Sequence, residues 1–208
     1  MLLRTNLSPL DEFLWAILGL LLTVAGTFME AAIALPNLLN EEGQFVLPSS
    51  WAAVPVYGLP VSYQVAAVLL VGCMGGRQAA ALSQVAYLIL GLSGFQVFSQ
   101  GGGLDYWREP TFGYLLGFVP GAWVCGWLAF RPQKRVSLEW LALSGLGGLL
   151  LIHVCGALYL SGLALAGQLS QPLVELLEQY SLFALPGQLV IVCLVAAVAR
   201  VLRLILLY

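Results

Sequence analysis

The sequence predicts an all-α membrane protein, with six transmembrane helices in one domain that covers residues 1–208. Of its 208 residues, 61% are hydrophobic, and the mean hydropathy is +0.94. Only 9% are charged, against roughly a quarter in soluble proteins. Several stretches reach the ~20 apolar residues that are needed to cross about 30 Å of hydrocarbon. The formal net charge of −2 gives no excess of basic residues that would suit nucleic acid, so we do not expect nucleic acid as a partner.

The six expected helices cover residues 13–35, 62–75, 78–98, 111–130, 137–167 and 186–208. The second is only about 21 Å long at 1.5 Å per residue, too short to cross alone. The stretch before it, "AAVPVYGLPVSYQ", holds two prolines and a glycine. We expect irregular backbone there at membrane depth, which is tolerated only where protein buries it or where it lines a cavity.

The later helices carry their own signals. In the fourth, Gly113, Gly117 and Gly121 recur every four residues, a small-residue stripe that lets a neighbouring helix approach closely. We expect the stripe to pack inside the monomer rather than in a dimer. In the last helix, Pro186 suits the first turn, where its missing N–H costs nothing. The four cysteines lie inside helices without a disulfide framework, and we expect them to be packing residues.

The charge distribution predicts the orientation of the helices. With six helices, both chain ends and the turns at Arg77 and "RPQKR" share one side of the membrane. That side holds seven of the eight basic residues: Arg4, Arg77, Arg131, Lys134, Arg135, Arg200 and Arg203. The positive-inside rule therefore places both termini in the cytoplasm. We expect a multi-pass protein of the plasma membrane that contacts membrane lipid.

Three stretches resemble a known family. They are "GLPVSYQ" (58–64), "GGGLDYWREPTFGYLLGF" (101–118) and "LPGQLVIVCLVAAVA" (185–199). They are similar to the BioY family, the biotin-binding S components of energy-coupling-factor (ECF) vitamin transporters. The resemblance implies a six-helix S-component bundle with a vitamin pocket near the outer face, closed by extracellular loops. It aligns Ser62 and Gln64 with a family Thr and Gln, Thr111 and Tyr114 with a Pro-Thr-Gly-Gly-Tyr block, and Gln188 with an Asp.

The sequence also departs from the family pattern. The family's last motif reads Pro-Gly-Asp-x-x-Lys, whereas this chain has Gln188 at the acid and Ile191 at the lysine. Phe112 replaces a glycine after Pro-Thr. These changes leave open a ligand other than biotin. The glycine-rich loop before Pro110 is interpreted as a lid, with glycines for tight turns and aromatic residues to cover a ring.

The chemistry of biotin indicates which side chains could bind it. Its ureido group needs a donor and an acceptor, which an amide supplies together, and its carboxylate suits Arg108, the one basic residue on the outer side. Arg108 could instead pair with Asp105 or Glu109 on a wet loop, and Glu30 could line the pocket or only its rim. The expected ligand-binding residues are Glu30, Ser62, Gln64, Tyr106, Trp107, Arg108, Thr111, Phe112, Tyr114 and Gln188. No catalytic residue, metal or cofactor is expected.

The sequence leaves two other classes of function open. "GLSG" and "HVCG" resemble the short motifs of rhomboid intramembrane proteases, in which Ser93 and His153 would form the dyad. A packing role for His153 is the simpler expectation. The chain could also be a solitary carrier. It has no Gly-x-x-x-x-Gly-Lys-[Ser/Thr] loop, so an S component would need separate ATPase subunits and a membrane coupling protein, which we expect to dock near Gly19, Thr23 and Thr27.

Overall fold

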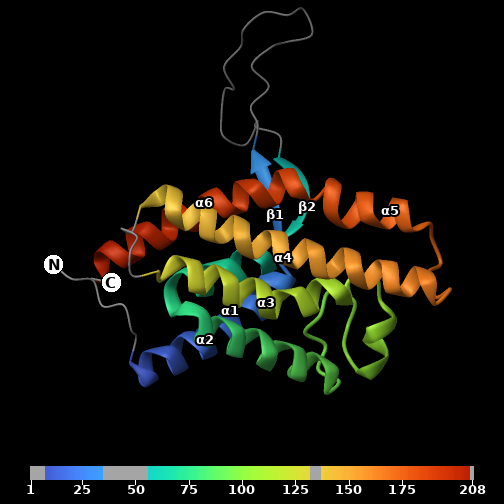
Figure 1. Cartoon of the computed structure of the whole chain (residues 1–208), viewed down its shortest axis with the longest axis horizontal. Helices are drawn as coiled ribbons and strands as arrows, with labels where there is room; N and C mark the ends of the chain where they lie inside the picture. Colours follow the sequence, from blue (N-terminus) through green and yellow to red (C-terminus); the bar gives the residue numbers. More distant parts are fainter. Residues whose placement is uncertain (1–7, 35–55, 132–136, 207–208) are drawn as a thin grey trace, which may run out of the picture.

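The computed structural model describes residues 8–34, 56–131 and 137–206, with the backbone alone for residues 30–34 and 56–61. Its elements, in chain order, are α1 (Pro9–Thr27), β1 (Glu30–Ala34), β2 (Val56–Ser62), α2 (Gln64–Leu92), the 3₁₀ turn η2 (Leu104–Arg108), α3 (Phe112–Ala129), α4 (Leu138–Leu165), α5 (Leu173–Leu177), the π turn η3 (Glu178–Leu182) and α6 (Leu185–Ile205). The long helices lie side by side, with the start of α1 and the end of α6 at the same end (Figure 1). Within the described ranges, five helical stretches are long and apolar enough to cross a membrane.

Helix α2 replaces the two helices that were expected at 62–75 and 78–98. The chain turns at Gly76, where φ is 75° and ψ is −179°, a conformation that glycine adopts without steric cost. Gln64 Nε2 lies 2.7 Å from Tyr87 Oη, although 23 residues of straight helix would separate them by about 35 Å. The two arms of α2 therefore lie antiparallel, as their opposite courses show (Figure 1), and Gln64–Leu92 as a whole is one of the five candidate spans.

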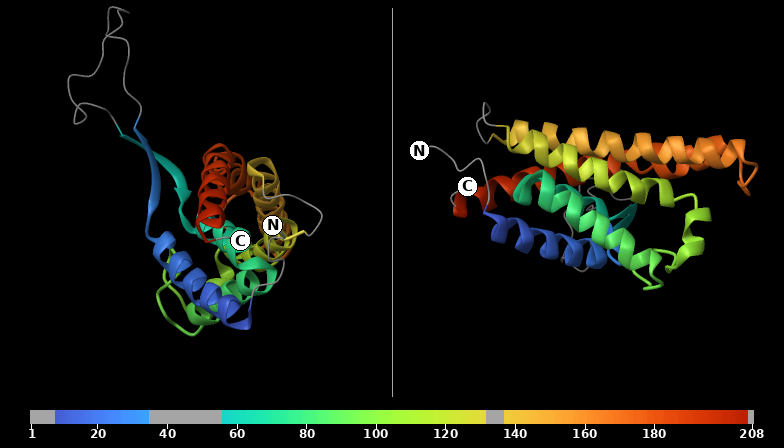
Figure 2. Two further views of the ribbon diagram at one scale, coloured as in Figure 1. Left: turned by 90° about the vertical axis from the view of Figure 1, so that its left-hand side faces the viewer. Right: turned by 60° about the horizontal axis from the view of Figure 1, so that its bottom comes forward.

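The predicted first helix is wrong at both ends. Helix α1 begins at Pro9, where Ser8 and Asp11 form a reciprocal capping box, and it ends at Thr27. Residues Glu30–Ala34 instead pair antiparallel with Val56–Ser62, and the two strands lead away from the helices (Figure 2). Once a segment leaves a helix its backbone needs new hydrogen-bond partners, and each strand supplies them to the other. The irregular backbone that was expected before residue 64 is thus partly a strand, and Ser62 belongs to it.

The remaining helix ends differ little from the prediction, except that α2 stops at Leu92 rather than at residue 98. Gly94, with φ of 98°, follows that end and takes the chain out of the helix. The short α5 and the π turn η3 were not predicted. The π turn ends at Leu182, four residues before Pro186, whose ring would clash with the Leu182 carbonyl in a regular helix.

Small residues bring the helices together. A Cβ atom at Gly117 would lie 2.9 Å from the Cα of Ile152, and one at Gly121 would lie 2.8 Å from the carbonyl oxygen of Gly148. The glycine stripe of α3 therefore packs on α4 inside the monomer, as expected. The repeat of Gly19, Thr23 and Thr27 is buried in α1, with Gly19 against the Ser83 side chain of α2. That repeat is not an open docking surface for a partner, because the chain's own α2 covers it.

Candidate functional site

A cavity of about 420 Å³ lies at the end of the bundle opposite to the start of α1. The C-terminal end of α1, the N-terminal ends of α2 and α3, the turn η3 and the beginning of α6 surround it. Its lining consists of Thr27, Ser62, Gln64, Val65, Ser99, Gln100, Thr111, Tyr114, Leu115, Phe118, Ile152, Gln179, Tyr180, Ala184 and Gln188. The volume falls in the range of small-molecule sites. Five predicted ligand residues, Ser62, Gln64, Thr111, Tyr114 and Gln188, meet here from three parts of the chain.

Tyr87 is the centre of a hydrogen-bond network behind the Gln64 side of the cavity. Its fully buried hydroxyl accepts from Gln64 Nε2 at 2.7 Å, lies 3.1 Å from Thr27 Oγ1 and donates to the Val97 carbonyl at 2.9 Å. Thr27 in turn donates to the carbonyl of Thr23. These bonds fix the orientation of Gln64, because one of its amide N–H groups is committed to Tyr87. Its amide oxygen remains for a ligand.

A second network fixes Gln188 on the opposite side. Gln188 Oε1 lies 2.6 Å from His153 Nε2, and His153 Nδ1 lies 3.0 Å from Ser181 Oγ. Ser181 Oγ is also 2.7 Å from the hydroxyl of Tyr114. The π turn η3 places Ser181 where it can reach both α3 and α4. Gln188 itself is buried, with 9% of its surface exposed, so its amide has few alternatives to this arrangement.

The predicted aromatic residues divide into two groups. Tyr106 and Phe112 are buried and belong to a chain of ring contacts that runs from Tyr87 through Phe98 to Tyr159. They support the loop and α3 but do not line the cavity. The loop is also held to α4, because the Tyr159 hydroxyl donates to the carbonyl of Trp107.

Trp107 and Arg108 are not among the described lining residues. The Trp107 side chain is 39% exposed, and the Arg108 guanidinium carbon lies 5.3 Å from the centre of its ring. Glu30 begins β1 opposite Ser62, and its side chain is outside the described part of the structure. The roles of these three residues in ligand binding stay predictions.

The electrostatics of the cavity come from backbone and neutral groups. The described lining contains no Lys, Arg, Asp or Glu. However, the first turns of α2 and α3 both contribute lining residues, and neither helix has a side-chain N-cap. The helix dipole gives such ends a positive partial charge, which favours an anion, although in α3 the N–H groups of Phe112 and Tyr114 already donate to the carbonyls of Glu109 and Thr111. Among the described residues, no group of three or more His, Cys, Asp and Glu could hold a metal ion.

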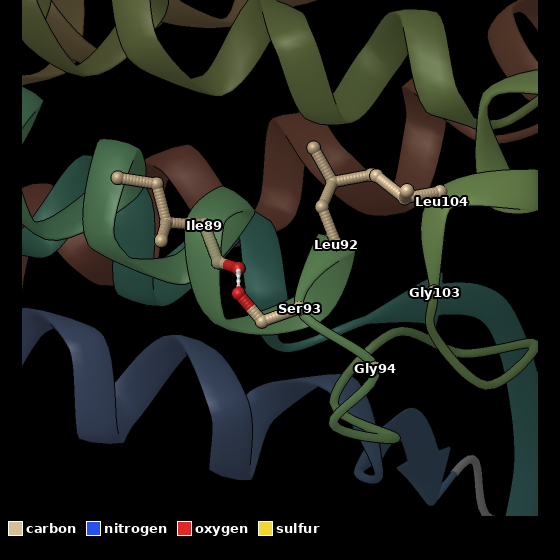
Figure 3. A pocket seen from close by; sticks show the side chains of 6 residues that line it. All are labelled: Ile89, Leu92, Ser93, Gly94, Gly103 and Leu104. Atoms are coloured by element: carbon tan, nitrogen blue, oxygen red, sulfur yellow. Dashed lines mark hydrogen bonds between the residues drawn. The ribbon is translucent and has the colours of Figure 1, made fainter.

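Ser93 and His153 do not form the dyad that the protease alternative requires. Ser93 lies in a separate open hollow with Ile89, Leu92, Gly94, Gly103 and Leu104. Its hydroxyl donates to the carbonyl of Ile89 at 2.7 Å, within its own helix (Figure 3). Both ring nitrogens of His153 bond to Ser181 and Gln188 instead. A nucleophile and its base must be within hydrogen-bond reach, so the short motifs have no catalytic counterpart here.

Comparison with known proteins matches residues 44–207 to the BioY family. The chain belongs to the BioY family. This confirms the resemblance that the three motifs carried. An uncharacterised 21.2 kDa protein of Cyanophora paradoxa is 30% identical over 193 residues, which cover 93% of this chain and 95% of that one. A probable biotin transporter BioY of Lysinibacillus sphaericus is 34% identical over 128 residues, which cover 62% of each.

A solved structure supports the fold. The crystal structure of the S-component for biotin from an ECF-type ABC transporter aligns with a TM-score of 0.67, covers 95% of both chains and is 17% identical. At that identity the structural match shows only the fold. This BioY chain therefore has an S-component-like fold.

The prediction from sequence missed several lining residues. They are Thr27, Ser99, Gln100, Gln179 and Tyr180, with Ser181 and His153 behind them. Ser99 and Gln100 directly precede the quoted glycine-rich stretch and could have been included with it. Gln179 to Ser181 carried no such signal, because the segment before Pro186 has the composition of an ordinary amphipathic connection.

Proposed function

We propose that this protein is the biotin-binding S component of an ECF-type transporter, which captures biotin in the cavity between Gln64 and Gln188. As a member of the BioY family, it is a transport component rather than an enzyme. The proposed architecture is a single domain that crosses the membrane six times, with the two arms of α2 counted separately and both termini in the cytoplasm. Biotin would then enter from outside, at the end that carries the cavity.

The observation that carries the proposal is the opposite polarity of the two amides. Gln64 commits an N–H to Tyr87 and keeps its oxygen, whereas Gln188 commits its oxygen to His153 and keeps its N–H groups. The ureido group of biotin has N–H donors and a carbonyl acceptor, so it needs both polarities on the protein. Leu115, Phe118 and Ile152 add apolar surface to the same lining, which suits the fused rings and the aliphatic chain.

The carboxylate of biotin would be bound without a cation from the described lining. Ser62 and Thr111 supply hydroxyl groups beside the uncapped first turns of α2 and α3, and helix N-termini stabilise anions. Arg108 is the one basic residue at this end of the predicted topology, and we retain it, with Trp107, Glu30 and the supporting residues Tyr106 and Phe112, as part of the proposed site. Movement of the loop would bring Arg108 to the ligand.

Titration of the purified, detergent-solubilised protein with biotin tests the proposed function. We expect saturable one-to-one binding by calorimetry, and a Kd that rises roughly tenfold or more in Gln188→Leu, since a buried polar partner of the ligand is lost. Ser144→Ala is a matched control, because Ser144 donates only to the Trp140 carbonyl of its own helix at the far end of α4. Absence of binding at millimolar biotin would refute the assignment of this ligand.

The proposed orientation and partners have separate tests. Leu104 is 76% exposed in the loop. The new thiol of Leu104→Cys should react in intact cells with a membrane-impermeant reagent, whereas that of Arg131→Cys should react only after permeabilisation. The reverse pattern would contradict a cytoplasmic location of both termini. For partners, we propose an ECF coupling protein and ATPase subunits. Biotin uptake by the chain expressed alone in cells that lack those subunits would instead support the alternative of a solitary carrier.

A further inference from the structure

His153 is the single histidine of the chain, and it lies directly behind the cavity without lining it. It projects from the middle of α4, with its ring edge-on to Tyr114 at 5.7 Å between centroids and 82° between planes. Its two nitrogens face different elements: Nε2 faces Gln188 of α6 at 2.6 Å, and Nδ1 faces Ser181 of η3 at 3.0 Å. His153 therefore links three helices that surround the ligand cavity.

The partners of His153 determine where its proton lies. The oxygen of an amide can only accept a hydrogen bond, so Nε2 must carry the proton. In the neutral ring Nδ1 is then an acceptor, which requires the Ser181 hydroxyl to donate to it. The single hydroxyl proton of Ser181 is thereby used, and Ser181 Oγ accepts from Tyr114 Oη at 2.7 Å. Every proton of this network points from Tyr114 towards Gln188.

The direction of the network matters because the oxygen and the NH₂ group of a side-chain amide have nearly the same size and shape. Turning the Gln188 side-chain amide by 180° exchanges its oxygen for its NH₂ group and reverses what the cavity offers to a ligand. In the reversed orientation the NH₂ group would face Nε2 of His153, which would then have to be the acceptor, with the ring proton on Nδ1 donating to Ser181 and Ser181 donating to Tyr114. A buried donor that faces a donor is unfavourable, so Gln188 can turn only if the proton of His153 moves to Nδ1 and the whole network reverses.

We propose that His153 is a positioning residue that sets the hydrogen-bond polarity of the cavity. It holds Gln188 with both N–H donors towards the ligand, so the ligand group at that point must be an acceptor. The inference rests on the proposed function, because two groups of biotin qualify: the ureido carbonyl and the carboxylate. His153 does not touch the ligand, and it determines specificity through Gln188.

Three ligands test the selection. Biotin is compared with 2-iminobiotin, in which the ureido carbonyl becomes a donor, and with norbiotinamine, in which an ammonium replaces the carboxylate. We expect His153→Leu to reduce the ratio of analogue Kd to biotin Kd roughly tenfold for one of the two analogues. This is the change expected when one hydrogen bond no longer distinguishes the ligands. The affected analogue identifies the group that Gln188 binds. His153→Gln, whose side chain retains a donor, should restore most of the preference.

Ser161→Ala is the control for substitutions in α4. Ser161 lies two turns beyond His153 and donates only to the carbonyl of Ala157, so its loss should leave both preferences unchanged. If His153→Leu weakens binding of all three ligands by the same factor, His153 has only a structural role and the inference is wrong.

Nuclear magnetic resonance of the protein with ¹⁵N-labelled histidine tests the same inference without a ligand. The chain has one histidine, so the pair of ring nitrogen signals needs no assignment to a residue, only the assignment of each signal to Nδ1 or Nε2. We expect the neutral Nε2–H tautomer, with a change in the Nε2 signal in Gln188→Leu. An Nδ1–H tautomer would overturn the inference even if biotin binds. If the wild-type protein fails to bind biotin, the proposed ligand is wrong, and the tautomer still decides whether His153 orients Gln188.

Discussion

Substituting Tyr87 by phenylalanine removes one hydroxyl group and tests the network behind the cavity. The aromatic ring remains, with its edge contact to Phe98 at 5.2 Å between centroids. The hydroxyl has three neighbours: Gln64 Nε2 at 2.7 Å, the Val97 carbonyl at 2.9 Å and Thr27 Oγ1 at 3.1 Å. Any change in Tyr87→Phe therefore reports these three contacts rather than a cavity in the core.

The expected loss of stability follows from what each neighbour can do next. Gln64 and Thr27 line the cavity, so water there can satisfy them. The carbonyl of Val97 is not part of that lining and lies in a partly buried bond, and loss of the partner of a buried group costs about 1–3 kcal/mol. We therefore expect the free energy of unfolding to fall by about 2 kcal/mol, which lowers the Tm of a chain of this size by roughly 4–8 °C. The biotin Kd should rise roughly 3- to 10-fold, since Gln64 loses its anchor.

Thermal unfolding in detergent, followed by circular dichroism, and calorimetric titration with biotin measure the two effects. Tyr63→Phe is the matched control, because Tyr63 is adjacent to Gln64 but is 36% exposed and outside the cavity lining. If Tyr87→Phe changes the Tm no more than Tyr63→Phe does, the Tyr87 hydroxyl does not stabilise this end of the bundle. An unchanged Kd would mean that the orientation of Gln64 does not depend on Tyr87.

Three further substitutions test the packing and the function. Gly117→Val should abolish the yield of folded protein, because a Cβ atom at residue 117 would already lie 2.9 Å from the Ile152 backbone. Gly162→Val should be tolerated, because no atom lies within 4 Å of a Cβ atom there. Equal yields of the two variants in size-exclusion chromatography would contradict the tight approach of α3 to α4. Arg203→Met should lower the Tm by roughly 4–12 °C, because the buried guanidinium donates to the carbonyls of Cys73 at 2.9 Å and Ala129 at 3.1 Å. A shift below about 2 °C would show that the stabilisation from these bonds barely exceeds the free-energy cost of removing the charge from water. Ser93→Ala should retain full biotin uptake, and a loss of uptake at normal expression would reopen a functional role for Ser93.

Arg203 shows how far charge counting from the sequence extends. The sequence places it among the basic residues at one end of the protein, and the positive-inside rule uses it only as one charge of seven. In the structure it is 3% exposed and binds carbonyls near the ends of the first arm of α2 and of α3. Its role is therefore to satisfy helix ends, which leave carbonyls without intrahelical partners. The sequence does not reveal this role, because the partners lie 130 and 74 residues away.

The local patterns predicted the helical class, most helix ends and the internal packing of the glycine stripe. These follow from hydropathy over about 20 residues, from proline and glycine, and from four-residue spacing, all of which act over short stretches of chain. The first helix was extended too far because Glu30–Ala34 is as apolar as the helix before it. Only pairing with Val56–Ser62 makes it a strand, and such pairing is absent from any local pattern.

By itself, the sequence determined that this protein is a helical membrane protein of the BioY family, and it identified five of the residues that line the cavity. These five residues lie in short stretches whose residue types and spacing resemble the family's motifs, so they can be found without coordinates. Only the tertiary structure showed that Gln64 and Gln188 line one cavity, with Nε2 of Gln64 against Tyr87 and Oε1 of Gln188 against His153. Hydrogen-bond direction depends on which atoms meet at about 3 Å, and only the packing of distant helices brings those atoms together.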